Sequence, residues 1–175
     1  MEGEHLQQAI AGKSDLTEKC PLKYLPPFLF DEHNCEWFDK ARPIKWVDPE
    51  AHGKYDMVAI GGGAGGLVTC IVARALGAGK VAMIERSLMG GDCLNSGCVP
   101  SKAFLKSANV VHTITKQAQK FGVKIDGAVT VDFGAVMARM RKIRADIAEA
   151  DSPQRMAETF GIDMFLGHAE FTGAN

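Results

Sequence analysis

Two cysteines spaced five residues apart give this sequence its clearest chemistry. Cys93 and Cys98 lie in the run GGDCLNSGCVPSK, residues 90–102. On a regular helix that offset would separate their Cα atoms by about 8–9 Å, more than the ~7 Å that a disulfide usually spans. A disulfide between them therefore requires irregular backbone, which the intervening Asn-Ser-Gly permits. Such a bond would be a candidate for reversible reduction.

The surroundings of the pair favour a reactive thiolate. A helix is expected directly after it, so a sulfur near that helix N-terminus lies at the positive end of the dipole, and Lys102 adds a cation. Two other interpretations stay open: a pair of ordinary buried thiols, or half of a zinc site, for which only the scattered His112 and His168 offer further ligands. No metal site is predicted. The remaining cysteines are expected to be ordinary thiols: Cys20, Cys35 and Cys70.

A glycine run at 61–66 predicts a dinucleotide site. Gly61, Gly63 and Gly66 form the pattern G-x-G-x-x-G between an expected strand and an expected helix, and Glu85 ends the next strand. The first glycine permits the tight turn, the second lets the backbone approach a pyrophosphate, and the third lets the helix pack closely on the strand. The helix N-terminus supplies N–H groups for phosphates, and Glu85 can accept hydrogen bonds from ribose hydroxyls. The alternative is a structural glycine turn.

The elements that position these residues alternate between strand and helix, which predicts an α/β fold with a βαβ unit. Strands are expected at 55–60, 80–84 and 162–166, with a fourth at 169–172. Helices are expected at 64–76 and 100–121, then after the N-cap residues Asp132 and Ser152. Residues 1–54 are expected to form an irregular extension with one short N-terminal helix. Its aromatic residues, Trp37, Phe38 and Trp46, suggest that part of it lies on a folded surface.

Composition excludes several classes of function. The 175 residues carry a formal net charge of −1, which argues against nucleic-acid or anionic-membrane binding. The basic run at 139–144 is expected to be the solvated face of a helix. No apolar run approaches the ~18 residues of a membrane span, and no targeting peptide is evident. Five cysteines, an odd number, without a secretory signal indicate an intracellular protein, cytoplasmic or in an organelle.

Together the glycine loop, Glu85 and the cysteine run resemble the class I pyridine nucleotide–disulfide oxidoreductases. The segments RPIKWVDP, LMGGDCLN and GIDMFLGHAEFTG are most similar to the mercuric-reductase-like branch. By this resemblance, Cys93 is the interchange thiol that attacks substrate, Cys98 is the charge-transfer thiol against the flavin ring, and Lys102 lies near the reactive flavin nitrogen. Asp92 departs from the family, in which Thr is common. The implied FAD-binding residues are Gly61, Gly63, Ala64, Gly65, Gly66, Glu85, Arg86, Gly91, Asp92, Cys98 and Lys102.

The resemblance also implies a fold and an activity. The expected fold is a three-layer Rossmann-like FAD/NAD(P)-binding domain at 55–175, incomplete at its C-terminus. The complete enzyme, a homodimer, would pass electrons from NAD(P)H through FAD to the Cys93–Cys98 disulfide, then to a small-molecule disulfide or a metal ion. The alternatives are a dihydrolipoamide dehydrogenase-like or glutathione reductase-like enzyme, or an inactive FAD-binding remnant. Because the sequence has one dinucleotide fingerprint, the chain alone is expected not to turn over NAD(P)H.

Overall fold

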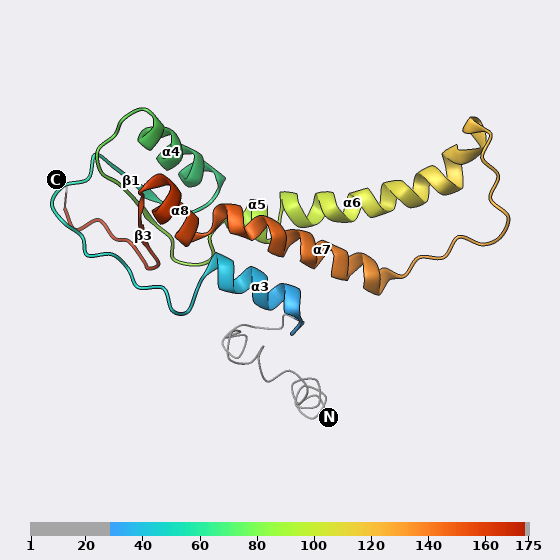
Figure 1. Ribbon diagram of the computed structural model, residues 1–175, viewed down its shortest axis with the longest axis horizontal. Helices are drawn as coiled ribbons and strands as arrows, with labels where there is room; N and C mark the ends of the chain where they lie inside the picture. Colours follow the sequence, from blue (N-terminus) through green and yellow to red (C-terminus); the bar gives the residue numbers. More distant parts are fainter. Residues whose placement is uncertain (1–28, 174–175) are drawn as a thin grey trace, which may run out of the picture.

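The computed structural model describes residues 29–173, and Figure 1 shows how their elements are arranged. A small sheet with two helices lies at one end, and the two longest helices extend side by side away from it. One further helix, near the N-terminal end of the described residues, packs beside the later of the two long helices. The sites predicted from the sequence fall where the sheet meets the start of the first long helix and the end of the second.

The sheet has three parallel strands in the order β1-β2-β3. They are β1 Met57–Ile60, β2 Val81–Ile84 and β3 Asp163–Phe165. Met57 pairs with Val81, and Met83 pairs with Met164. This order is the 3-2-1 half of a doubly wound sheet, which confirms the predicted α/β class. The prediction of a fourth strand is wrong, because residues 169–172 are irregular.

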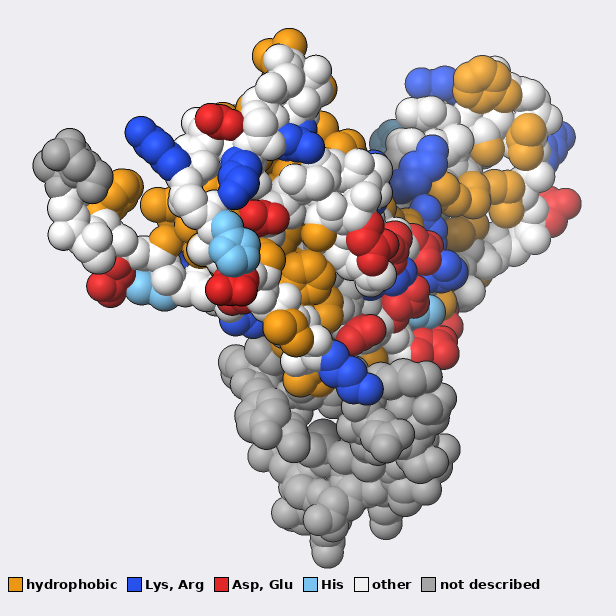
Figure 2. All heavy atoms as spheres, turned by 60° about the vertical axis from the view of Figure 1, so that its left-hand side comes forward, with side chains coloured by type: hydrophobic (Ala, Val, Ile, Leu, Met, Phe, Trp, Pro, Cys, Tyr) orange, Lys and Arg blue, Asp and Glu red, His pale blue; other side chains and the backbone are white. Residues whose placement is uncertain are grey.

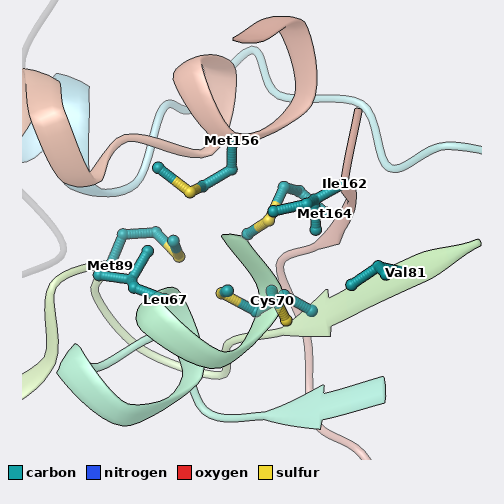
Figure 3. Close-up of a cluster of buried hydrophobic side chains, with 8 residues drawn as sticks. Leu67, Cys70, Val81, Met89, Met156, Ile162 and Met164 are labelled. Atoms are coloured by element: carbon teal, nitrogen blue, oxygen red, sulfur yellow. The ribbon is translucent and has the colours of Figure 1, made fainter. Parts of the chain in front are cut away.

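Two helices cover one face of the sheet, α4 Ala64–Ala75 and α8 Pro153–Phe160. Figure 3 shows the core between them, to which α4 contributes Leu67 and Cys70 and α8 contributes Met156. On the other face Val58 and Ile60 are about half exposed. The described residues therefore form two layers at the sheet, and the third layer remains a prediction. Hydrophobic side chains also reach the surface among charged ones in Figure 2.

The long helices begin and end differently from the sequence expectation. Helix α6, Cys98–His112, starts two residues before the predicted position and continues as a π-helical turn, Thr113–Gln117, and a 3₁₀ turn, Ala118–Phe121. Gly122 ends it in the left-handed conformation, φ +73°. Helix α7, Phe133–Ala148, has the predicted Asp132 N-cap, and a 3₁₀ turn, Glu149–Asp151, follows it before the predicted Ser152 N-cap of α8.

The segment before the sheet is more ordered than expected. It contains helix α3, Glu32–Ala41, whose N-cap Asp31 accepts a hydrogen bond from the Asn34 N–H. Trp37 and Phe38 are buried against short helix α5, Gly91–Asn95, and against α7, so this part of the segment lies on a folded surface as predicted. A short N-terminal helix before residue 29 would lie outside the described residues.

Residues 42–48, here called the strap, run along the outer edge of β3. The Trp46 indole N–H donates to Met164 O at 3.3 Å, and Asp48 Oδ1 accepts from the Leu166 N–H at 2.9 Å. Arg42 donates to Ser87 O at 2.6 Å and to Leu166 O at 3.4 Å. The strap therefore occupies the carbonyl oxygen of Met164 in β3, and the N–H and carbonyl oxygen of Leu166 just after β3.

The basic run at 139–144 is a solvated face only in part, which corrects the sequence interpretation: Arg139 and Lys142 are exposed. Arg144 is buried, Arg139 donates to Ala103 O at 3.1 Å, and Arg141 pairs with Asp31 of the α3 N-cap. These side chains join α7 to α3 and α6. Among residues 29–173, no helix is both long and apolar enough to cross a membrane.

Candidate active site

The glycine loop takes the conformation that the fingerprint requires. Gly61 has φ +112°, a region that side-chain-bearing residues rarely adopt, and its N–H donates to Ile84 O at 2.8 Å. Gly63 is the N-cap of α4, and it has no side chain to occupy the free N–H groups of the first turn. A Cβ on Gly66 would lie 2.0 Å from Gly61 O. The third glycine is therefore required by packing.

Glu85 holds the glycine loop from the end of β2. Its Oε2 accepts from the Gly62 N–H at 2.7 Å, and its Oε1 accepts from the Ser87 N–H at 2.6 Å. The residue is 8% exposed. Each carboxylate oxygen keeps a further lone pair, so Glu85 can still accept a hydrogen bond from a ribose hydroxyl. The bond to Gly62 was not predicted, although Glu85 itself was.

A cavity of about 290 Å³ opens at the carboxyl ends of the strands. This is where open parallel sheets bind nucleotides. The residues at its wall include Gly61, Glu85, Arg86, His168 and Ala169. A nucleotide fits this arrangement, because the glycine turn, the carboxylate and an open hollow meet at one place. Sequence reasoning missed His168 and Ala169 as wall residues, although their position just after the third strand could have indicated them.

The thiol segment, residues 88–98, packs directly on the glycine loop. The Gly90 N–H donates to Gly62 O at 2.8 Å. Gly91 has φ +56°, and a Cβ there would lie 2.7 Å from Gly63 Cα. Only a glycine allows this contact between the two backbones. The structure thus brings the predicted dinucleotide loop and the predicted thiol pair together through backbone contacts.

The backbone between the two cysteines is irregular, as predicted. Helix α5 ends at Asn95, and α6 begins at Cys98. The N–H groups of Ser96 and Gly97 both donate to Asp92 O, at 3.0 and 2.5 Å, and a Cβ on Gly97 would lie 2.8 Å from that oxygen. This turn replaces the helical geometry that would hold the thiols too far apart.

Cys93 and Cys98 are both free thiols here, and their side chains share a hydrogen bond. This bond raises the pKa of Cys93, and slight burial adds to the rise, while the nearby Lys102 cation opposes it. For Cys93 the neighbouring thiol outweighs the cation, so its pKa is raised and not lowered. Cys98 is exposed at the first position of α6.

The other predicted residues and cysteines have varied surroundings. Asp92, Arg86 and Lys102 are exposed. The backbone oxygen of Asp92 accepts the hydrogen bonds of the turn between the two cysteines. Cys70 is a buried free thiol, as predicted. Cys35 is disulfide-bonded, which corrects its assignment as an ordinary thiol, and Cys20 lies outside the described residues. In the described part of the chain, no three His, Cys, Asp or Glu side chains gather as a metal ion would require.

Comparison with known proteins gives matches that include this site. A family model described as pyridine nucleotide-disulphide oxidoreductase matches residues 55–152. The chain is 36% identical over 122 residues to a dihydrolipoyl dehydrogenase of Acholeplasma laidlawii, covering 70% of this chain and 35% of that protein. A dihydrolipoyl dehydrogenase of Mycobacterium leprae is 44% identical over 121 residues, with 69% and 25% covered, and one of Bacillus subtilis is 38% identical over 120 residues, with 69% and 24% covered. The chain spans about a third or less of the length of these curated relatives.

Proposed function

The chain belongs to the pyridine nucleotide-disulphide oxidoreductase family, and on that premise we propose that it binds FAD at the glycine loop and presents Cys93 and Cys98 as a redox-active pair. The observation that carries this proposal is the direct contact between the two sites, Gly90 N–H to Gly62 O at 2.8 Å. A dinucleotide held by residues 61–66 would be next to the backbone that carries the thiols.

The glycine loop and Glu85 would hold the ADP portion of FAD. Free N–H groups at the start of α4 would donate to the pyrophosphate, and Glu85, with Arg86 beside it, would bind the adenosine portion in the cavity after the strands. Gly91, Asp92 and Lys102 would face the flavin portion, as the family resemblance implies. Bound FAD would supply two-electron reduction of the disulfide.

The two cysteines would have separate roles. Reduction of the disulfide takes up two electrons and two protons and yields the dithiol state that the structure holds. Cys93 would exchange with substrate and Cys98 would face the flavin. The raised pKa of Cys93 means that this thiol would need a base before it attacks. We propose a homodimeric complete protein that takes its electrons from NAD(P)H.

The relatives favour one substrate class. They are dihydrolipoyl dehydrogenases, which supports a small dithiol or disulfide as the partner rather than a metal ion. The comparisons do not show the mercuric-reductase-like branch that the sequence resemblance suggested. We also propose that the 175-residue chain alone does not turn over NAD(P)H, because we assign its one fingerprint to FAD. Flavin reduction by NADH or NADPH at enzymatic rates, with only this chain and FAD, would contradict that.

Flavin titration of the Gly63→Val variant tests the FAD site. A Cβ at residue 63 has only Gly91 Cα nearby, at 3.6 Å, so the variant should fold. Its side chain should block the phosphates and weaken FAD binding by about tenfold to a hundredfold, as an added clash of 1–3 kcal/mol would. Gly134→Val, in the first turn of α7 and away from the sheet in Figure 1, is the control. Equal FAD affinity in the two folded variants would refute the assignment.

A further inference from the structure

Asn95 lies between the two thiols and ties the thiol segment to α3. Its side-chain amide donates to the carbonyl oxygens of Gly91 at 2.8 Å and Met89 at 3.1 Å. Its side-chain oxygen accepts from the indole N–H of Trp37 at 2.8 Å. The two ends of the amide therefore hold different segments, and the indole fixes which end faces α3.

Arg144 of α7 contacts the same groups from another side. Its Nη1 donates to Asn95 O at 3.0 Å, and its Nη2 donates to Asn34 Oδ1 of α3 at 2.6 Å. The guanidinium carbon lies 3.8 Å from the centre of the Trp37 ring. The residue is only 6% exposed. Because a buried cation depends on such partners, the position of Asn95 is coupled to both α3 and α7.

A backbone contact adds to these side-chain contacts. The Met89 N–H, at the start of the thiol segment, donates to Ala41 O at the end of α3 at 3.0 Å. Trp37 and Leu94 also belong to one buried apolar cluster. Helix α3 thus contacts the thiol segment at both Met89 and Asn95, on either side of Cys93.

We infer that α3 positions the Cys93–Cys98 pair, with Trp37 and Arg144 as positioning residues for the backbone that carries both thiols. Helix α3 lies before residues 55–152, the part that matches the family model. The support for the thiol pair therefore comes partly from a segment outside the family match. The inference rests on the proposed role of the pair as redox-active thiols.

The positioning should affect the thiol–disulfide equilibrium. Oxidation by glutathione disulfide joins the two protein sulfurs. The two electrons and two protons pass to glutathione disulfide, which becomes two glutathione molecules. Because α3 and Arg144 already hold the backbone at Met89 and Asn95, closing the bond costs less conformational entropy than it would in a free segment. Losing the Trp37 hydrogen bond would free the segment in the dithiol state and disfavour the disulfide by about threefold to tenfold. The upper value corresponds to a rise of about 30 mV in the reduction potential.

Two matched tryptophan variants test this. Trp37→Phe keeps an aromatic ring under Arg144, removes the indole donor to Asn95, and leaves the site with a smaller buried ring. Trp46→Phe makes the same change in the strap, where the lost acceptor is Met164 O of β3. Each chain is equilibrated in glutathione buffers of stepped composition and quenched with iodoacetamide. Mass spectrometry of the tryptic peptide of residues 87–102, which holds both thiols, then gives the fraction of disulfide. Urea unfolding measures stability in parallel.

The expected result is a threefold to tenfold loss of disulfide preference in Trp37→Phe and none in Trp46→Phe. If Trp37→Phe does not fold, Asn34→Ala, which removes the α3 acceptor of Arg144, takes its place with the same expected direction. An unchanged equilibrium in the folded variant, or an equal change in Trp46→Phe, would overturn the inference alone. A wild-type chain that never forms the Cys93–Cys98 disulfide would overturn the proposed redox pair and this inference with it.

Discussion

Two neighbouring glycines of α4 should respond oppositely to the same substitution. Gly65 has open space where a Cβ would be placed, whereas a Cβ on Gly66 would lie 2.0 Å from the backbone oxygen of Gly61. Both positions are in the first turn of α4, so alanine gives both a similar gain in helix propensity, up to about 1 kcal/mol. The difference in stability between the two variants therefore isolates the contact between Gly66 of α4 and the Gly61 backbone.

The size of that difference follows from the geometry. Real Cβ atoms essentially never approach other atoms closer than 3.0 Å, so Gly66→Ala requires α4 and the loop to separate by about 1 Å. The atom in the way belongs to the backbone, and no side-chain rotation can relieve the clash. Overpacking of this kind costs about 1–3 kcal/mol. With a urea m-value of about 2 kcal/mol/M, Gly66→Ala should unfold at about 0.5–1.5 M less urea than Gly65→Ala.

Urea unfolding followed by circular dichroism measures this directly. Gly65→Ala should unfold at or slightly above the wild-type midpoint, and Gly66→Ala clearly below it. Equal midpoints would mean that the start of α4 lies farther from Gly61 than the structure places it, and the packing role of the third glycine would then be wrong.

Three further outcomes are expected. Burial and the hydrogen bond from the Tyr55 hydroxyl to Asp163, at 2.7 Å, raise the pKa of Tyr55 to about 12. The bond should contribute fully to stability below pH 10 and be lost as the pH rises toward 12. In a pH titration followed by phenolate absorbance, the late transition should disappear in Tyr55→Phe and move to lower pH in Asp163→Asn. Ser152→Ala, which removes the buried cap that accepts from the Arg155 N–H at 3.1 Å, should lower the free energy of unfolding by about 1 kcal/mol in urea titration. Cys98→Ala, which removes the hydrogen bond that raises the pKa of Cys93, should move Cys93 alkylation to lower pH, and an unchanged pH profile would contradict that cause.

The parts of the fold that the sequence predicted depend on local signals. The glycine loop, Asp132 and Ser152 each act on backbone groups within a few residues, so their spacing alone indicates a turn or a helix start. The break between Cys93 and Cys98 was predictable for the same reason, because Gly97 follows polar residues that favour turns.

The parts that the sequence missed depend on distant contacts. Arg144 carries a charge, and the pattern of its own helix predicts exposure; its burial follows from Asn34 and Trp37, more than 100 residues earlier. Residues 169–172 alternate like a strand, yet no neighbouring strand pairs with them among the described residues. Tertiary partners decide such cases, and a single sequence does not reveal those partners.

The strap has a consequence for how this sheet can grow. With Trp46 bonded to Met164 O and Asp48 bonded to the Leu166 N–H, a new strand that approached β3 would have to displace these side chains to pair with those two groups. Within the described residues β1 is the other edge, with Val58 and Ile60 about half exposed. A strand added from elsewhere in a longer polypeptide, or an unwanted strand from another molecule, should therefore join next to β1. Assembly and aggregation would then compete for the same edge of the molecule.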